Sequence, residues 1–371
     1  MLIYDEVLSF IETPRLEMFE PLALAVFRYQ FENVRVYRQY CDSCGASPES
    51  VSVLDQIPAV STVAFKYAHV HNTGEPDSAA VLTFLTSGTS KGFTERGKHR
   101  VPRMEVYRAS AIGHLRRMLF PDGARMAMLA LHPTGDLMPE SSLSTMLTWC
   151  IEQFGTNSVL CAAARNSVNT NAAIDFLQEA HARRVPVCIL GTTAASAKLF
   201  ESIEGRGRTL RLPAGSRLMD TGGAKGQVIP LTPVEVVARA HACLGIEPAL
   251  VINEYGMTEM CSQLYDATPF NSDFIGHGGY RVKLPPPWLH PTILDPVTLR
   301  PAPEGQVGLI GFFDLANVGS ISALITEDFG FVHDGAVAIL GRAAAGGARG
   351  CALSIEEFAS RESVALGRPS R

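Results

Sequence analysis

The feature that most constrains the fold is an alternation of short apolar runs with segments of helical spacing. Met126–Leu131 and Val185–Leu190 are continuous apolar runs, the pattern of strands buried on both faces. Residues 105–120 carry apolar side chains at helical spacing. Thr232-Pro-Val-Glu235 predicts a helix start, with threonine as N-cap, proline at N1 and glutamate at N3, and that helix is expected to end at Gly245. The alternation predicts an α/β fold in which helices flank parallel sheets.

Small and polar residues follow three of the predicted strands. Leu82–Leu85 leads into Thr86–Gly92 (TSGTSKG), Arg217–Met219 leads into Asp220–Gly226 (DTGGAKG), and Val251–Ile252 leads into Asn253–Glu259 (NEYGMTE). Ligands of parallel α/β sheets bind beyond the carboxyl ends of the strands, so we expect these segments to carry the ligand site.

The chain is expected to form one large domain over residues 1–340. Its first 65 residues are predicted to be mostly helical. Val307–Phe313 and Ile321–Ile325 are shorter strand-like runs joined by Gly and Asn turns, which predicts a small β-rich subdomain at about residues 270–340. A separate segment, residues 341–371, is rich in Gly, Ala and Arg and contains one short helical stretch.

Composition excludes several other classes of protein. Hydrophobic residues make up 46% of the chain and charged residues 19%, which allows a large buried core and argues against long disorder. The formal net charge of −5 argues against a nucleic-acid-binding protein. No apolar run reaches the roughly 18 residues that a membrane span needs. The first residues, MLIYDEVLSF, lack the basic region of a signal peptide, so the cytoplasm is the expected compartment.

Most of the eight cysteines are expected to be reduced, small apolar residues in that compartment. Cys41 and Cys44 form a CxxC without a second ligand pair at zinc spacing, so a structural role is favoured over a metal or redox role. Five others lie in apolar segments and are predicted to be core residues: Cys150, Cys161, Cys188, Cys243 and Cys261.

Two of the polar segments have the chemistry of a nucleotide site. In Thr86–Gly92, small residues expose backbone N–H groups that can wrap phosphates and a lysine adds charge, although the spacing is not that of a Walker loop and an ordinary loop has the same composition. In Glu254–Glu259, Tyr255 can cover a nucleobase, and Glu259 can hold Mg²⁺, which prefers oxygen ligands. A strand-to-helix turn with solvent-facing acids is the alternative for the second segment.

A resemblance to a known family rests on the order of short motifs along the chain. They are TFLTSGTSKG (83–92), GGAKG (222–226), EYGMTE (254–259), TEDFG (326–330) and GR (341–342). In this order they resemble the adenylate-forming superfamily of acyl-CoA synthetases, adenylation domains and luciferases. Within it the chain looks like the LuxE-type acyl-protein synthetases, which activate fatty acids for a partner acyl reductase. That likeness covers nearly the whole chain, from Ile57-Pro58 to Arg349–Phe358.

The resemblance implies the fold of the superfamily's large N-terminal domain and a site for ATP and Mg²⁺. Thr86, Ser87, Gly88, Thr89, Ser90, Lys91 and Gly92 would hold the β- and γ-phosphates, and Gly222, Gly223 and Ala224 would line the adenine. Tyr255 would stack on that base, and Gly256 would let the backbone approach it. Thr258 would bond the α-phosphate and Glu259 would bind Mg²⁺.

The resemblance also implies roles for three residues outside those segments. Asp328 would take the ribose hydroxyls, helped by Arg342. His132, at the end of the predicted strand 126–131, would lie near the substrate carboxylate; a structural histidine is the alternative.

The sequence departs from the superfamily pattern in two places. Thr326-Glu-Asp328 replaces Thr-Gly-Asp, which adds the charge of Glu327 near the ribose position. Only residues 343–371 follow Arg342, so the C-terminal domain that brings a lysine to adenylation in ordinary members is expected to be truncated, and the usual route to CoA with it.

Cys351 offers a substitute acceptor for the acyl group. A thiolate that attacks an acyl-adenylate gives a thioester and releases AMP. Arg342, Arg349 and a short helix after Cys351 favour a low thiol pKa, and Gly346–Gly350 can act as a hinge. In the LuxE-type family a C-terminal cysteine carries the acyl group before transfer. An incidental tail cysteine is the alternative.

Together these residues predict an AMP-forming ligase that loads a fatty acid onto Cys351 and hands it to a partner acyl reductase or acyl carrier. One alternative is an acyl-CoA or aryl-CoA ligase of the phenylacetate type that works without the small domain. A second is a non-catalytic subunit that binds a nucleotide or an acyl group, which the intact Tyr255–Glu259 segment argues against.

Overall fold

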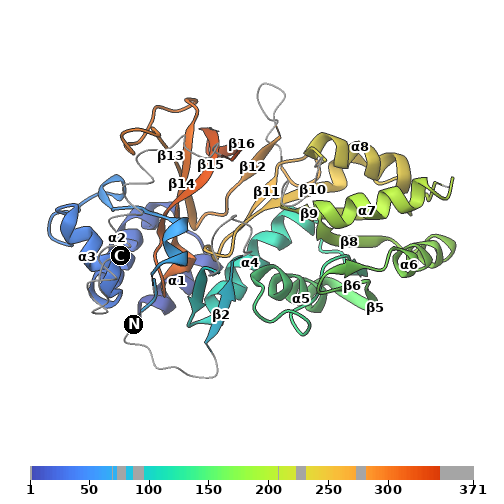
Figure 1. The fold of residues 1–371 in the computed structure, drawn as a ribbon, viewed down its shortest axis with the longest axis horizontal. Coiled ribbons are helices and arrows are strands. Elements are labelled where there is room, and N and C mark those ends of the chain that lie inside the picture. Colours follow the sequence, from blue (N-terminus) through green and yellow to red (C-terminus); the bar gives the residue numbers. More distant parts are fainter. Residues whose placement is uncertain are drawn as a thin grey trace, which may run out of the picture. The chain divides into compact units, whose positions relative to one another are not determined.

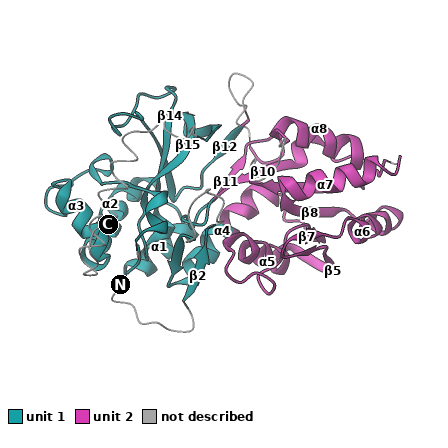
Figure 2. Ribbon diagram, in the orientation of Figure 1, with its two compact units in different colours: residues 1–111, 257–262, 282–371 teal, residues 112–256, 263–281 magenta. Residues whose placement is uncertain are grey.

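The structure is a computed structural model that describes residues 2–68, 70–72, 81–86, 96–207, 209–222, 231–272 and 281–342. The chain divides into two compact units (Figure 2). Unit 1 comprises residues 1–111, 257–262 and 282–371, and unit 2 comprises residues 112–256 and 263–281. The short segment Met257–Ser262 therefore belongs to unit 1, although the residues on both sides of it belong to unit 2.

Unit 1 begins with the helical region that the sequence predicts. Its elements are α1 (Ile3–Glu12), η1 (Leu16–Met18), α2 (Phe19–Asn33), α3 (Arg35–Ser43), η2 (Leu54–Gln56), β1 (Val60–Ser61) and η3 (Thr62–Lys66) (Figure 1). Gln30 of α2 is buried and donates to the carbonyl oxygen of Asn317 at 3.0 Å. This bond ties α2 to the later part of unit 1.

Antiparallel strands form the later part of unit 1. These strands are β12 (Val282–Leu284), β13 (Leu289–Leu294), β14 (Gly308–Asp314), β15 (Ala323–His333) and β16 (Ala336–Arg342), in the order β13-β14-β15-β16-β12, and β1 pairs in parallel with β15. The 3-10 turn η5 (Leu315–Asn317) follows β14 directly. Asp334 and Gly335 join β15 to β16 with φ angles of 48° and 75°, the left-handed pair that a two-residue hairpin turn requires.

Unit 2 contains the predicted parallel sheet. Its strands are β4 (Met126–Ala130), β5 (Gly155–Cys161), β8 (Val187–Thr192), β9 (Arg217–Thr221), β10 (Val251–Tyr255) and β11 (Leu264–Asp266), in the order β11-β10-β9-β8-β4-β5. All neighbours are parallel except β10 and β11. The other elements are α5 (Ser142–Phe154), β6 (Ala163–Ala164), β7 (Ser167–Val168), α6 (Thr170–Ala182), α7 (Thr193–Glu204), α8 (Pro233–Leu244) and η4 (Pro248–Leu250).

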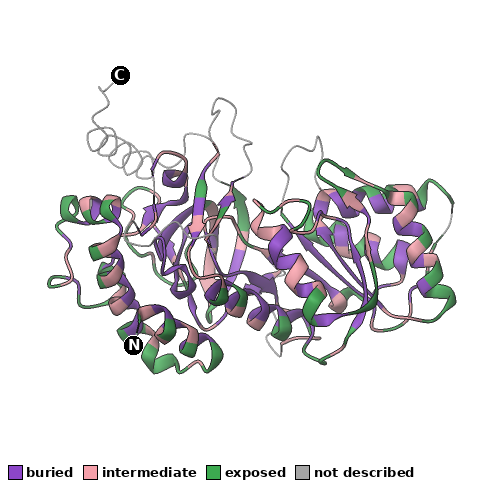
Figure 3. Cartoon of the chain, turned by 90° about the horizontal axis from the view of Figure 1, so that it is seen from below, coloured by how far each residue is buried: buried purple, intermediate pink, exposed green. Residues whose placement is uncertain are grey.

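The core of unit 2 lies between its sheet and its helices. Every residue of β4 is buried, as its apolar run predicts, and every residue of β9 is buried although that strand contains Arg217 and Asp220. Figure 3 colours the chain by burial. Helix α8 begins at the predicted capping box, in which Thr232 and Glu235 exchange hydrogen bonds, and Gly245 ends it with a φ of 69°. These local signals in the sequence therefore fix both ends of the helix.

The strand that precedes the predicted phosphate loop pairs differently from our expectation. We expected Leu82–Leu85 to belong to a parallel sheet, but as β2 it pairs antiparallel with β3 (Lys98–Val101). The hairpin is closed by Thr86, which accepts from the Gly97 amide at 2.8 Å. Helix α4 (Met104–Leu119) follows it as predicted. Within the described ranges, no helix is long and apolar enough to cross a membrane.

Candidate active site

The carboxyl ends of the parallel strands in unit 2 bring together several predicted site residues. The sheet register sets Thr192 opposite Thr221, and Thr221 opposite Glu254, so β8, β9 and β10 end side by side. Gly222 follows β9 immediately, and Tyr255 is the last residue of β10. The two segments expected to hold the adenine therefore begin at one edge of one sheet.

A buried polar cluster sets the backbone at the end of β9. Asp220 is 2% exposed, and it accepts hydrogen bonds from Thr193 at 2.7 Å and from the Asn253 amide at 3.0 Å. The Thr193 hydroxyl also lies 3.1 Å from the carbonyl oxygen of Gly222. Gly222 has a φ of 84°, which favours glycine, so the chain turns sharply here. Gly223 and Ala224 lie outside the described residues.

A Cβ atom at Gly256, at the end of β10, would crowd two neighbouring side chains. A Cβ atom there would lie 2.4 Å from the Glu254 carboxyl group and 3.2 Å from Cγ of Gln263. Glu254 is buried and accepts a hydrogen bond from the Thr221 hydroxyl. Tyr255 is half-buried.

Sequence reasoning missed Gln263 as a site residue. Its side chain is 4% exposed, and its amide oxygen has no hydrogen-bond partner among the described residues. A buried polar atom without a partner is costly, which marks positions where a ligand or water completes the bonding. No motif signals this residue, because its proximity to Gly256 arises only when β11 turns back beside β10.

His132 lies just beyond β4, as expected. Its Nε2 atom is buried without a hydrogen-bond partner in the described part of the chain, and burial lowers the pKa of His132 to about 4. The imidazole is therefore neutral at neutral pH. It borders a pocket of about 130 Å³ whose polar lining includes Arg165, Thr192 and Lys198, all within unit 2.

In unit 1, Thr86 is the described part of the predicted phosphate loop. It is buried, and its carbonyl oxygen accepts from Arg96 Nε at 2.6 Å. Ser87, Gly88, Thr89, Ser90, Lys91 and Gly92 lie outside the described residues. The hairpin closed by Thr86 and Gly97 therefore fixes where this loop begins.

Thr258 and Glu259 lie in the segment Met257–Ser262, and both side chains are half-buried. Their backbone carbonyl oxygens accept hydrogen bonds from His99 and Asn317, at 2.6 and 2.9 Å. The backbone of the two residues that would contact phosphate and metal is therefore held by side chains from elsewhere in unit 1.

Asp328 and Arg342 are cross-strand neighbours on β15 and β16. The Arg342 guanidinium lies 3.9 Å from the Asp328 carboxylate and 3.8 Å from the Glu327 carboxylate. The buried hydroxyl of Thr326 accepts from the Asp328 amide at 3.1 Å and fixes its backbone. Glu327, which replaces the glycine of the superfamily pattern, therefore lies near the same exposed arginine, Arg342, as Asp328, the residue predicted to bind the ribose.

No described cysteine forms a disulfide, and four of the five predicted core cysteines are buried, whereas Cys161 is only partly buried. Cys44 is exposed and Cys161 is partly buried, and the remaining five are buried: Cys41, Cys150, Cys188, Cys243 and Cys261. Burial raises the pKa of the Cys41 and Cys188 thiols to about 12, which suppresses their thiolate forms. Cys351 lies outside the described residues.

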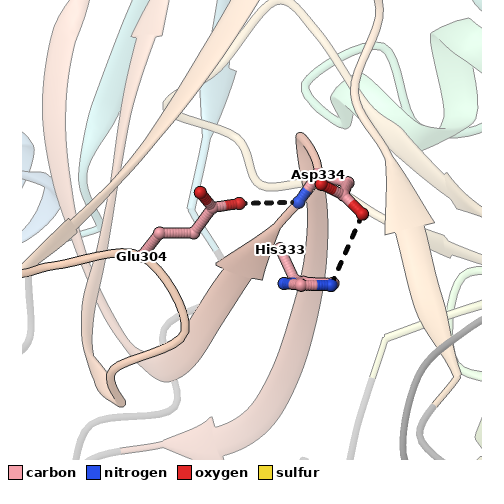
Figure 4. A group of neighbouring side chains, drawn as sticks. All are labelled: Glu304, His333 and Asp334. Carbon is pink, nitrogen blue, oxygen red and sulfur yellow. Dashed lines mark hydrogen bonds and ion pairs between the residues drawn. The ribbon is translucent and has the colours of Figure 1, made fainter.

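A second group of potential metal ligands lies at the hairpin turn after β15. Ligand atoms of Glu304, His333 and Asp334 lie within 4.8 Å of one another (Figure 4). The Glu304 carboxylate accepts from the Asp334 amide at 2.8 Å, and His333 lies 3.4 Å from the Asp334 carboxylate. These contacts stabilise the turn, and the group contains none of the predicted site residues.

Comparison with known proteins identifies the family. The family model described as acyl-protein synthetase, LuxE, matches residues 2–359. The chain belongs to this family. Membership confirms the predicted resemblance and the predicted enzyme class, a ligase.

Two relatives carry the name long-chain-fatty-acid–luciferin-component ligase. The ligase of Aliivibrio fischeri is 20% identical over 365 residues, which cover 91% of this chain and 88% of that protein. The ligase of Vibrio harveyi is 38% identical over 79 residues, which cover 19% of this chain and 21% of that protein.

Solved structures confirm the predicted fold class. 2-Hydroxyisobutyryl-CoA ligase in its postadenylation state, in complex with 2-HIB-AMP, matches with a TM-score of 0.66 and 17% identity over 89% of this chain and 69% of that chain. Its open conformation with 2-HIB-AMP and CoA matches with a TM-score of 0.64 and 16% identity over 87% of this chain and 69% of that chain. At such low identity the likeness establishes the fold alone.

Proposed function

We propose that this LuxE-family chain activates a fatty acid as an acyl-adenylate, with ATP and Mg²⁺, and then transfers the acyl group to the thiol of Cys351. A partner acyl reductase would accept the acyl group from there. The observation that carries the proposal is the LuxE family match over residues 2–359. The ordered motifs support it, because each has the chemistry that one part of an ATP site requires.

The residues present fit a nucleotide and a magnesium ion. Gly222 and Gly256 expose backbone where a side chain would be strained or excluded, as close approach of a ligand requires. Glu259 supplies a half-buried carboxylate, the ligand type that Mg²⁺ prefers. When bound, the ion would neutralise charge on the phosphates of ATP.

In the proposed first step, a carboxylate oxygen of the acid forms a bond to the α-phosphorus of ATP. The bond from that phosphorus to the bridging oxygen breaks, and pyrophosphate leaves. Tyr255 would hold the base, Asp328 the ribose and Thr258 the α-phosphate, so the reactants are aligned before reaction. His132, neutral near pH 7, would offer a hydrogen bond to the acid without adding a charge.

In the proposed second step, the sulfur of Cys351 loses its proton to water and forms a bond to the acyl carbon. The bond from that carbon to the AMP oxygen breaks, which leaves a thioester on the protein. We assign the first step to residues 1–340, including the β-rich part from about residue 270, and the second to residues 341–371. Residues 343–371 contain no lysine, and Cys351 is the group of this segment that we expect to act in the second step.

The direct test is to incubate the protein with Mg·ATP and radiolabelled acids, with medium- and long-chain fatty acids beside benzoates. Label on the protein that requires ATP and is released by hydroxylamine is the expected result. AMP production only when CoA is added would instead indicate an acyl-CoA ligase. ATP–pyrophosphate exchange absent with every acid would refute catalysis.

Two substitutions separate the two steps. Cys351→Ser is expected to keep ATP–pyrophosphate exchange and to abolish stable labelling; full labelling of this variant would exclude the proposed carrier role. Glu259→Ala is expected to abolish exchange, because the metal loses its protein ligand. Exchange at the wild-type rate and ordinary Mg²⁺ concentration would exclude the proposed metal role of Glu259.

A further inference from the structure

We propose that His99 and Asn317 are positioning residues for adenylation, which act by holding the backbone of Thr258 and Glu259. The inference rests on the proposed function in one respect only, that these two residues act on the α-phosphate and the metal. Neither His99 nor Asn317 belongs to any of the predicted motifs. Both come from unit 1, to which the segment Met257–Ser262 also belongs.

The segment Met257–Ser262 has no helix or strand of its own to hold it. Its backbone bonds instead to side chains from distant parts of unit 1. At its far end, Asp314 is fully buried and accepts from the Cys261 amide at 2.9 Å and from the Ser262 hydroxyl at 2.6 Å. At its near end, the carbonyl oxygens of Thr258 and Glu259 are the anchored atoms.

His99 anchors Thr258 with a directed hydrogen bond. Its Nδ1 atom lies 2.6 Å from the Thr258 carbonyl oxygen, and a carbonyl oxygen only accepts, so Nδ1 carries the proton. Burial lowers the pKa of His99 to about 4, although its hydrogen bonds with the Thr258 carbonyl and the Asn317 side chain oppose that shift. The ring also packs edge-on against Phe65, with centroids 5.6 Å apart. One neutral tautomer in one orientation therefore holds Thr258.

The Asn317 side chain bonds both to Glu259 and to Ile321, a residue close to it in the sequence. Its amide nitrogen donates to the Glu259 carbonyl oxygen at 2.9 Å and to the Ile321 carbonyl oxygen at 2.8 Å. Its amide oxygen accepts from the Cys261 thiol at 3.3 Å. Asn317 is 1% exposed, and losing these bonds would leave the carbonyl oxygens of Glu259 and of the buried Ile321 without this donor.

His99 also links this segment to the predicted phosphate loop. It lies on β3 directly opposite Phe84 of β2, in the hairpin that Thr86 and Gly97 close. One side chain thus connects the start of the loop expected to hold the β- and γ-phosphates with the residue expected to hold the α-phosphate. A change in its length or hydrogen bonding is expected to shift the two segments relative to each other.

The test compares His99→Asn, His99→Gln and His99→Leu in ATP–pyrophosphate exchange. The amide nitrogen of asparagine can replace Nδ1, that of glutamine replaces Nε2, and leucine donates no hydrogen bond. We expect kcat to fall about 10- to 100-fold in His99→Leu and His99→Gln, because small displacements of reacting groups have effects of this size, and to recover to within about threefold in His99→Asn. Asn317→Leu is expected to lower kcat as His99→Leu does.

The matched control is His114→Asn. His114 is 3% exposed, lies on α4 and packs edge-on against Tyr265, so its loss reports the general effect of replacing a buried histidine. Its kcat is expected to match wild type. Hydrogen–deuterium exchange supplies a readout independent of activity: residues 257–262 are expected to exchange faster in His99→Leu than in His114→Asn.

The outcomes separate this inference from the proposed function. If the wild-type protein shows no ATP–pyrophosphate exchange with any acid, the proposed function is refuted. Hydrogen–deuterium exchange of residues 257–262 would still show whether His99 and Asn317 hold this segment. Active wild type together with unchanged kcat and unchanged deuterium exchange in His99→Leu and Asn317→Leu would overturn the inference alone. If His99→Leu does not fold, equal kcat values for His99→Asn and His99→Gln would overturn it.

Discussion

Gly256→Ala tests whether the end of β10 is as tightly constrained as the structure indicates. The new Cβ would lie 2.4 Å from the carboxyl oxygen of Glu254, about 1 Å short of the 3.4 Å at which ordinary contact begins. That oxygen is at the tip of a flexible side chain, but Glu254 is only 4% exposed and accepts a hydrogen bond from Thr221. The carboxyl group can therefore move only by weakening this bond.

The expected cost combines a lost hydrogen bond with overpacking. A buried hydrogen bond contributes about 1 kcal/mol, and overpacking by one methyl group costs about 1 to 3 kcal/mol. Because the Glu254 side chain can partly move away from the new methyl group, we expect Gly256→Ala to lower the free energy of unfolding by about 1 to 3 kcal/mol. Tyr255 precedes the displaced position, so the KM for ATP is expected to rise as well.

Urea unfolding and ATP–pyrophosphate exchange measure the two effects. Gly205→Ala is the control, because its Cβ would meet only the Glu201 carbonyl oxygen, at 3.2 Å. Glu254→Asp shortens the obstructing side chain, so the double variant Gly256→Ala/Glu254→Asp should be less destabilised than the sum of the single changes. A Gly256→Ala protein with wild-type stability and wild-type KM for ATP would refute this account of the strand end.

Three further predictions concern buried groups. Burial raises the pKa of Asp314 to about 6, above its ordinary value of 3.8, so the folded protein binds this proton more tightly than the unfolded chain, and stability falls as the pH rises from about 4 to about 6. Between pH 7 and pH 4 the unfolding free energy of wild type, measured against Asp314→Asn, should therefore rise on the order of 3 kcal/mol, and a flat difference would contradict the shifted pKa. Gln263→Met removes an amide oxygen that has no partner among the described residues and should raise the free energy of unfolding by about 1 kcal/mol in calorimetry, where a decrease would mean that the amide is bonded. Gly330→Ala places a Cβ 2.2 Å from the Ala338 backbone oxygen and should cost about 2 kcal/mol or more, which a thermal midpoint equal to that of wild type would disprove.

Features that depend on neighbouring residues were predictable from the sequence. The capping box of Thr232 and Glu235 and the left-handed Gly245 involve residues within one turn of α8, so the local pattern determines both ends of that helix. The apolar runs of β4 and β8 are buried because both faces of the sheet are covered, and a continuous run reports this directly. The order of the motifs likewise indicated the family.

Features that depend on distant pairing were not predictable. The expectation for Leu82–Leu85 was wrong because a short apolar run does not reveal whether its neighbour in the sheet is parallel or antiparallel; the hydrogen bonds of Thr86 and Arg96 with the hairpin determine this. Gln263 was missed for the same reason, since its position beside Gly256 follows from the turn between β10 and β11.

The motif residues and the residues that hold them carry different kinds of sequence information. Thr258 and Glu259 were found because their own side chains have phosphate and metal chemistry in a short recognisable order. His99 and Asn317 bond only to the backbone of those residues, at separations of 159 and 58 positions. Any residue at positions 258 and 259 would present the same carbonyl oxygens. The motif therefore does not indicate which residues elsewhere in the chain donate hydrogen bonds to it. The precision of such a site is therefore encoded mainly outside its motifs, and substitutions at His99 and Asn317 test that directly.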